Sequence, residues 1–139
     1  MKSLFKFFMT IYTGLYRLSK GKLGGRMAGT KVLLLTTTGR KSGKTHTAPL
    51  GFFDWQGGYV IVASNGGQPK HPAWYHNLKS HPQVTVQMFD QVIPVTAEVL
   101  AGEARAQAWQ QVITTAPGYA GYEKQTTREI PLVLLHPSK

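Results

Sequence analysis

The feature that most constrains the fold is a short basic turn between two segments of high β propensity. The segments are Val32–Thr38 and Thr47–Phe53, and the turn between them is Gly39–His46. It contains two glycines, three cations and two hydroxyl side chains, but no carboxylate. Two interpretations stay open: a solvated hairpin loop, or a turn whose N–H groups and cations bind an anion, in the first instance a phosphate.

The turn is not the phosphate-binding loop of nucleotide hydrolases. That motif has four residues between its glycine and the Gly-Lys-Ser/Thr sequence, and it begins a helix. Here three residues separate Gly39 from Gly43, and the following segment has the composition of a strand. The spacing therefore argues against a nucleotide hydrolase.

Positive charge is concentrated in the first third of the chain. The 139 residues carry a net charge of +10, and the first acidic residue is Asp54. Ten of the 16 cations precede it: Lys2, Lys6, Arg17, Lys20, Lys22, Arg26, Lys31, Arg40, Lys41 and Lys44. Such asymmetry indicates an anionic partner, which can be a lipid surface, a nucleic acid or a polyanionic cofactor. The chain has no cysteine, which excludes disulfides, thiolate metal sites and cysteine nucleophiles.

Residues 4–18 predict an amphipathic helix. At about 100° per residue its polar side chains share one narrow stripe, and the remaining surface is apolar and partly aromatic. The stripe consists of Lys2, Lys6, Thr10, Thr13, Arg17 and Lys20. The helix is too short to span a bilayer, and Lys6 within the apolar run argues against a signal peptide. Residues 1–20 either lie on an anionic membrane surface or pack on protein; no nucleic-acid-reading motif is found.

The remainder predicts one mainly β domain. A Gly-rich basic linker, 20–29, separates the helix from it, so we expect two parts, residues 1–29 and 30–139. Besides the first hairpin, further strands are expected at 59–64, 84–88, 92–100 and 130–135, helices at 73–79 and 103–115, and a loop at 116–122. About six antiparallel strands joined by short turns, with inserted helices, predict a compact barrel.

Conventional catalytic groupings are absent from the sequence. The acids form no close pair, and Ser64 lacks the Gly-x-Ser-x-Gly context of a nucleophile elbow. His71, His76 and His81 are five residues apart, which does not suit helical metal ligands, so no metal site is expected. What remains is a pocket for a flat, phosphorylated cofactor, formed by the basic turn, Ser64 with its glycine loop, and the Trp74-Tyr75 helix.

Several motifs in order resemble the deazaflavin (F420)-dependent nitroreductase family. They are Leu34–Lys44, Pro49-Leu50, Val62–Gly67 and Lys70–Leu78, followed by Tyr119, Tyr122 and Ile130-Pro131. The resemblance extends from about residue 31 to the end. It implies a split β-barrel, a membrane-associating terminal helix, and reduced coenzyme F420 (F420H2), a deazaflavin with a phosphate and an acidic polyglutamate tail.

The resemblance also implies roles for individual residues. Arg40, Lys41 and Ser42 would hold the phosphate region, and Ser64 and Tyr119 would act at the accepting oxygen. Ser64, Trp74, Tyr119 and Tyr122 would form the substrate face of the ring. The coenzyme groove would be completed by His46, Thr47, Ala48, Pro49, Leu50, Gly51, Val62, Ala63, Asn65, Ala73, Tyr75, His76 and Asn77. The family member that reduces nitroimidazoles has tyrosines where this chain has Gly51 and Ala116, and lysine at Asn65, so whether this chain reduces nitroimidazoles stays open.

The sequence thus predicts an F420H2-dependent reductase that transfers a hydride to a quinone, an enone or a nitroaromatic compound. It is expected in the cytoplasm or at the inner face of the cell membrane. Two alternatives stay open: an oxidoreductase of related fold that uses FMN, and a basic membrane-surface or cofactor-binding module without enzymatic activity.

Overall fold

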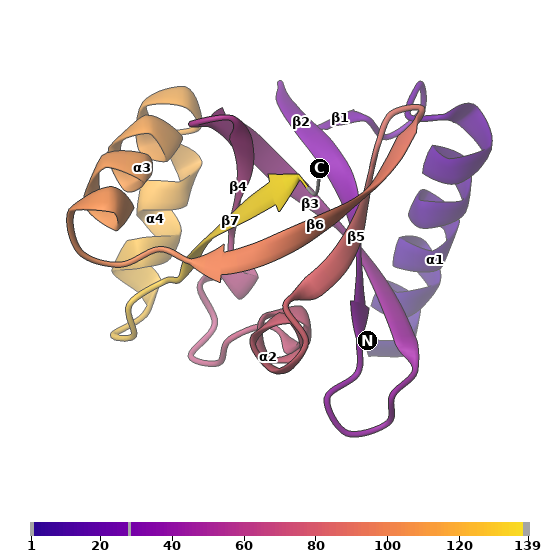
Figure 1. Ribbon diagram of the computed structural model, residues 1–139, viewed down its shortest axis with the longest axis horizontal. Helices are drawn as coiled ribbons and strands as arrows, with labels where there is room; N and C mark the ends of the chain where they lie inside the picture. Colours follow the sequence, from indigo (N-terminus) through magenta and orange to yellow (C-terminus); the bar gives the residue numbers. More distant parts are fainter. Residues whose placement is uncertain (1, 28, 138–139) are drawn as a thin grey trace.

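A closed antiparallel barrel forms the centre of the molecule (Figure 1). The computed structural model describes residues 2–27 and 29–137. Within these residues the barrel order is β2-β3-β4-β7-β6-β5, and β5 pairs again with β2. The strands are β2 (Thr30–Thr38), β3 (Thr45–Trp55), β4 (Gly58–Val62), β5 (Gln83–Met88), β6 (Gln91–Val99) and β7 (Leu132–Pro137). The predicted mainly β barrel is confirmed, and a short strand β1 (Arg26–Met27) extends it beside β2.

Helices cover two sides and one end of the barrel. Figure 1 shows α1 (Lys2–Ser19) along one side, and α3 (Gly102–Thr115) with α4 (Gly118–Gln125) along the opposite side. The helix α2 (Ala73–Ser80) lies at the end where the β2–β3 turn projects, and the 3₁₀ turn η1 (Asn65–Gly67) precedes it in the chain.

Alternation along the strands divides the apolar side chains into three clusters. On β2, Leu33 and Leu35 face the barrel interior with Phe52 and Val86. Because neighbouring strand residues point to opposite faces, Val32 and Leu34 face outward, toward α1. A third cluster lies between the barrel and α3, where Trp109 and Val112 pack on strand residues. Burial of these faces fixes the register, since a one-residue slip would turn the side chains that face the barrel interior to the outer face.

The terminal helix is joined to the barrel through one fully buried side chain. Tyr16 is 0% exposed; its hydroxyl donates to the Val32 carbonyl at 2.8 Å and accepts from the Phe89 N–H at 2.8 Å. The Gly-rich linker is also docked: Gly21 and Gly25 are buried against Phe89, where a Cβ would collide. One face of α1 therefore packs on the protein, and the opposite face is exposed.

The segment expected as a loop at residues 116–122 is instead mostly helical. Helix α4 begins after Pro117, whose φ of −59° suits a first turn, and continues to Gln125. Its two glycines, Gly118 and Gly121, lower the intrinsic helix propensity and misled the sequence prediction. Tyr119 packs edge-on against Phe53, at 5.9 Å between ring centroids, and this tertiary contact stabilises α4 despite its low helix propensity.

Candidate functional site

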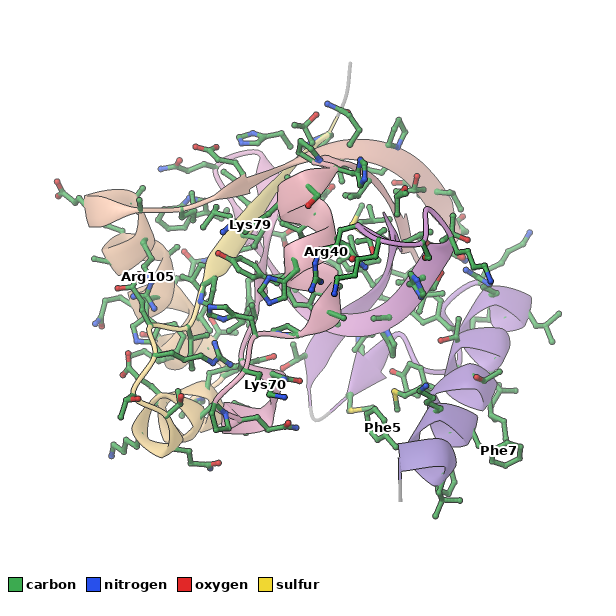
Figure 2. The ribbon with its side chains drawn as sticks, turned by 90° about the horizontal axis from the view of Figure 1, so that it is seen from below. Phe5, Phe7, Arg40, Lys70, Lys79 and Arg105 are labelled. Carbon is green, nitrogen blue, oxygen red and sulfur yellow. The ribbon has the colours of Figure 1, made fainter. Side chains whose placement is uncertain are left out.

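A basic cleft lies between the β2–β3 turn and α2. Its volume is about 320 Å³. The lining residues are Gly39, Arg40, Lys41, Ser42, His46, Thr47, Ala48, Ala73, Trp74 and Asn77. Figure 2 views the molecule from this end and shows Arg40 beside α2. Two cations, Arg40 and Lys41, and the hydroxyls of Ser42 and Thr47, with no carboxylate among the lining residues, form a donor set for an anionic group.

The turn is folded by its own hydrogen bonds. The Gly39 N–H donates to the Lys44 carbonyl at 2.7 Å, and the Gly43 N–H donates to the Gly39 carbonyl at 2.9 Å. Gly43 has a φ of 73°, a conformation that glycine adopts without steric cost. At Gly39 a Cβ would lie 2.6 Å from the Ser42 Oγ, so a side chain here would displace that hydroxyl. The cations therefore stand on a preformed turn and not on a free loop.

Asn77 holds α2 against the turn. Its side chain is buried; Oδ1 accepts from the Arg40 backbone N–H at 3.1 Å, and Nδ2 donates to the Thr37 Oγ1 at 3.2 Å. Both partners are almost forty residues away in sequence, at the turn and at the end of β2. Because buried amides are costly when unpaired, this contact fixes the width of the cleft.

Positive charge around the cleft alters histidine ionisation. Burial lowers the pKa of His76 below its usual value, and the nearby charges of Arg40 and Lys79 lower it further. His76 is therefore neutral at pH 7 and leaves the positive charge of the cleft to Arg40 and Lys41. On the rim, Arg17 of α1 donates from Nη2 to the Thr47 Oγ1 at 3.0 Å, and Thr47 also contacts the Thr36 hydroxyl at 2.9 Å.

A second group of predicted residues surrounds the end of β4. Ser64 is 8% exposed and directly precedes η1, where Asn65, Gly66 and Gly67 all have positive φ angles. Asn65 donates from Nδ2 to the Lys70 carbonyl at 3.0 Å, which closes the loop that leads to α2. The glycine loop is thus a defined turn.

Tyr119 and Tyr122 lie together on α4. Their ring centroids are 5.7 Å apart in an edge-to-face arrangement. Burial raises the pKa of Tyr119, with a smaller contribution from Tyr122, so the phenol remains protonated at neutral pH. A Cβ on Gly51 would lie 3.1 Å from the Tyr119 hydroxyl. Any side chain at residue 51 would therefore contact the Tyr119 hydroxyl through its first carbon atom.

The predicted residues fall into three groups. Nine line the cleft: Arg40, Lys41, Ser42, His46, Thr47, Ala48, Ala73, Trp74 and Asn77. Two are buried in the barrel interior, Ala63 and Tyr75, while Leu50 packs against that interior and Val62 lies in the cluster beneath α3. The others, Pro49, Gly51, Ser64, Asn65, His76, Tyr119 and Tyr122, lie outside the lining set. The part of all these residues in coenzyme or substrate binding, those that line the cleft included, stays a prediction.

Sequence reasoning missed two residues that the structure places beside the predicted site. Arg17 reaches the rim of the cleft from α1, and Arg128 contacts the segment around Ser64. Gly39, which begins the basic turn predicted to bind an anion, lines the cleft as well. Arg17 and Arg128 contact residues 30 and 64 positions away, and no local pattern marks either of them.

Comparison with known proteins decides the family. The model of the F420H(2)-dependent quinone reductase family matches residues 8–137. The chain belongs to this family. An F420H(2)-dependent quinone reductase of Mycobacterium tuberculosis is 37% identical over 131 residues, which cover 91% of this chain and 88% of that protein. A second M. tuberculosis protein, described as a putative F420H(2)-dependent quinone reductase, is 34% identical over 76% of this chain and 88% of its own length.

Solved structures agree with the family in sequence and fold. A structure described as an F420-H2 dependent reductase (FDR-A) is 45% identical, with a TM-score of 0.69, and covers 76% of this chain and 93% of its own. The split β-barrel predicted from the sequence is therefore confirmed. As a member of the F420H(2)-dependent quinone reductase family, the chain is an oxidoreductase whose cofactor is reduced coenzyme F420. This confirms the predicted enzyme class and cofactor.

Proposed function

We propose that the chain is a quinone reductase that binds the phosphate region of F420 in the cleft between the β2–β3 turn and α2. The observation that carries this proposal is the preformed turn with Arg40, Lys41 and Ser42 on a cleft that has no lining carboxylate. A guanidinium, an ammonium and a hydroxyl are the groups that bind phosphate oxygens most strongly. The donors fit the anionic part of this coenzyme, and the 320 Å³ cleft is open enough to receive it.

The protein's part in the reaction is to bind, orient and donate hydrogen bonds. When bound, reduced F420 supplies a hydride, and the quinone becomes a hydroquinone after it also takes up a proton. We assign Trp74 to the wall of the ring site, because it lines the cleft from α2. Ser64 and Tyr119 are assigned to the acceptor side, where their hydroxyls donate to the quinone oxygen as negative charge develops on it.

The state of Tyr119 agrees with that role. Burial raises its pKa, so it retains its proton throughout the neutral range and serves as a hydrogen-bond donor. It does not release the proton readily, so we expect the second proton of the hydroquinone to come from solvent. Ionisation of Tyr119 should therefore not lower the rate of quinone reduction between pH 6 and about pH 9.

Anaerobic mixing with F420H2 tests the function. We expect the protein to oxidise F420H2 with a soluble naphthoquinone and with menaquinone in detergent, followed by the absorbance of oxidised F420. Parallel reactions with an enone and a nitroaromatic define the acceptor range, and Ser64→Ala and Tyr119→Phe should each lower kcat at least fivefold. Binding of F420 without oxidation by any quinone would contradict the proposed acceptor class.

We also propose that α1 attaches the enzyme to an anionic membrane surface. In residues 2–27 and 29–137 no helix is long and apolar enough to cross a membrane. Yet α1 exposes large apolar side chains without burying them on the barrel: Leu4, Phe5, Phe7, Phe8, Ile11, Leu15 and Leu18. Figure 2 shows Phe5 and Phe7 on α1, on the side of the molecule opposite Arg105. Lys6, Arg17 and Lys20 accompany them, and no acid lies on the helix.

Substitution is a sharper test of this surface than deletion, because Tyr16 belongs to the core. Replacing Phe5, Phe7 and Phe8 with serine should lower binding to vesicles of phosphatidylglycerol and phosphatidylcholine at least tenfold in a sedimentation assay. The matched control replaces the exposed Val92 and Val99 of β6 with serine and should leave binding within twofold. Equal vesicle binding by wild type and the triple variant would contradict the membrane role, while F420 binding should be unchanged in both.

A further inference from the structure

One guanidinium holds both ends of the loop that follows β4. Arg128 lies between α4 and β7. It donates from Nη2 to the Ser64 carbonyl at 2.8 Å, from Nη1 to the Ala63 carbonyl at 3.2 Å, and from Nε to the Gln68 carbonyl at 3.1 Å. A further bond links Nη1 with the His71 Nδ1 at 2.9 Å. The planar fork of arginine suits such convergent acceptors, and lysine cannot reproduce its geometry.

The loop that Arg128 holds is a tight turn with three successive left-handed φ values: Asn65 at 48°, Gly66 at 65° and Gly67 at 80°. Gly66 and Gly67 adopt such angles without steric cost, whereas Asn65 does so at a small cost, and its side chain bonds the Lys70 carbonyl. Packing against α4 contributes to holding the turn, since Gln125 lies against Gly67. Backbone bonds within the loop restrain it too, from the Gly67 N–H to the Ser64 carbonyl and from the Gln68 N–H to the Asn65 carbonyl. The bonds from Arg128 add a restraint from outside the loop, at the Ser64 and Gln68 carbonyls.

Arg128 makes no ion pair within the part of the chain that the structure describes. Its charge is directed at carbonyl dipoles and at His71, which must accept at Nδ1 and therefore carry its proton on Nε2. Burial lowers the pKa of His71 below its usual value, and the charge of Arg128 is the next largest cause. His76 and Lys79 also lower it, so His71 stays neutral and keeps its bond to Arg128 at pH 7.

We infer that Arg128 is a positioning residue for the reaction: by fixing the Ala63–His71 loop it places Ser64 at the acceptor side of the site. This inference rests on the proposed position of Ser64 beside the acceptor. In the part of the chain that the structure describes, the hydrogen bonds of the Arg128 guanidinium go to loop carbonyls and to His71, so its effect passes through the loop. The phosphate clamp at Arg40 and Lys41 is a separate element, on the β2–β3 turn. Loss of Arg128 should therefore impair turnover more than coenzyme affinity.

Arg105 offers a matched control. It also lies half-buried beside the same connecting segment, donates from Nη2 to the Ile130 carbonyl at 2.7 Å, and pairs with Glu129 at 3.4 Å. Its guanidinium packs on Trp109. These contacts hold the start of β7 against α3 and do not involve the Ala63–His71 loop. Its loss should cost stability without altering the reaction.

The experiment compares Arg128→Ala, Arg128→Lys and Arg105→Ala in the full chain. Four quantities are measured: F420 affinity by fluorescence, kcat and KM with F420H2 and a soluble naphthoquinone, amide exchange of residues 65–68, and the His71 pKa by NMR. The last two are measured in the coenzyme-free protein. For Arg128→Ala we expect kcat to fall at least tenfold, F420 affinity to stay within threefold, exchange to accelerate at least tenfold, and the His71 pKa to rise. Arg128→Lys should be intermediate in each, and Arg105→Ala should match wild type in all four despite a lower melting temperature.

Distinct outcomes overturn the inference. The inference is refuted if Arg128→Ala keeps the kcat and the amide exchange of the wild type. It is also refuted if kcat falls as far in Arg105→Ala as in Arg128→Ala. Should Arg128→Ala fail to fold, Arg128→Lys decides, since wild-type exchange and kcat in that variant would refute the role. If exchange accelerates but kcat does not fall, the loop is held by Arg128 yet does not position Ser64, and the inference fails. Failure of the wild-type protein to bind F420 would instead refute the proposed site, which is a separate result.

Discussion

Replacing Arg40 and Lys41 together with alanine should raise the dissociation constant of F420 at least tenfold. Both cations line the cleft, and charge-assisted bonds to phosphate are stronger than neutral ones. A tenfold change corresponds to about 1.4 kcal/mol of binding free energy, which is modest for two such groups on a preformed turn. Fluorescence titration with oxidised F420 measures the effect directly. Because exposed charges are screened by salt, the difference between wild type and variant should narrow as the salt concentration rises.

Lys44→Ala provides the control for this prediction. Lys44 is exposed, belongs to the same turn and carries the same charge, but it does not line the cleft. We expect its loss to change F420 affinity less than twofold. Because the double variant removes twice the charge, a loss of binding free energy in Lys44→Ala half as large as in the double variant would mean that the turn attracts the coenzyme through its net charge alone. An unchanged dissociation constant in the double variant would refute the clamp.

Tyr16→Ala should lower the free energy of unfolding by about 3–5 kcal/mol, the usual cost of removing a buried aromatic ring. Tyr16 is fully buried, and its hydroxyl joins β2 to the segment after β5. The loss is a large fraction of the roughly 5–15 kcal/mol that stabilises a typical protein. Urea denaturation followed by tryptophan fluorescence measures it, and all tryptophans lie outside α1. A helix that behaved as an independent unit would leave this transition unchanged.

Two variants separate the contributions of Tyr16. Tyr16→Phe keeps the ring but leaves the Phe89 N–H and the Val32 carbonyl without that partner, which should cost about 1–3 kcal/mol. Leu18→Ala lies on the same helix but is 86% exposed, so it should stay within about 0.5 kcal/mol of wild type. The division of the chain at residue 29 remains a proposal. If α1 and the barrel of Tyr16→Ala unfold together in one transition, α1 belongs to the same folded unit as the barrel.

The barrel was predictable because its signals are local. The β2–β3 hairpin follows from two β-prone runs joined by a turn with two glycines, and the other strands follow from similar runs bounded by turns. Helix α4 was not predictable, since Gly118 and Gly121 oppose it and the packing of Tyr119 on Phe53 stabilises it from a distance.

The candidate site was predictable in part for the same reason. The basic turn and the Trp74 helix are continuous segments, and the structure brings them to one cleft. Asn77 was assigned to the coenzyme groove, but its bonds to Arg40 and Thr37 give it a structural task as well. No sequence pattern marked Arg128. Its partners are mostly backbone carbonyls, which every residue has, and they lie about 60 positions away in the sequence.

The close approach of Tyr119 to Gly51 has a consequence for engineering the acceptor range. Position 51 is small in this chain, and the phenol of Tyr119 lies where a larger residue there would begin. A methyl group at position 51 would require the Tyr119 hydroxyl, and the Thr30 methyl that is equally near, to shift by a few tenths of an ångström, and a larger side chain would require more. Libraries that aim to change the acceptor range should therefore vary positions 51 and 119 together.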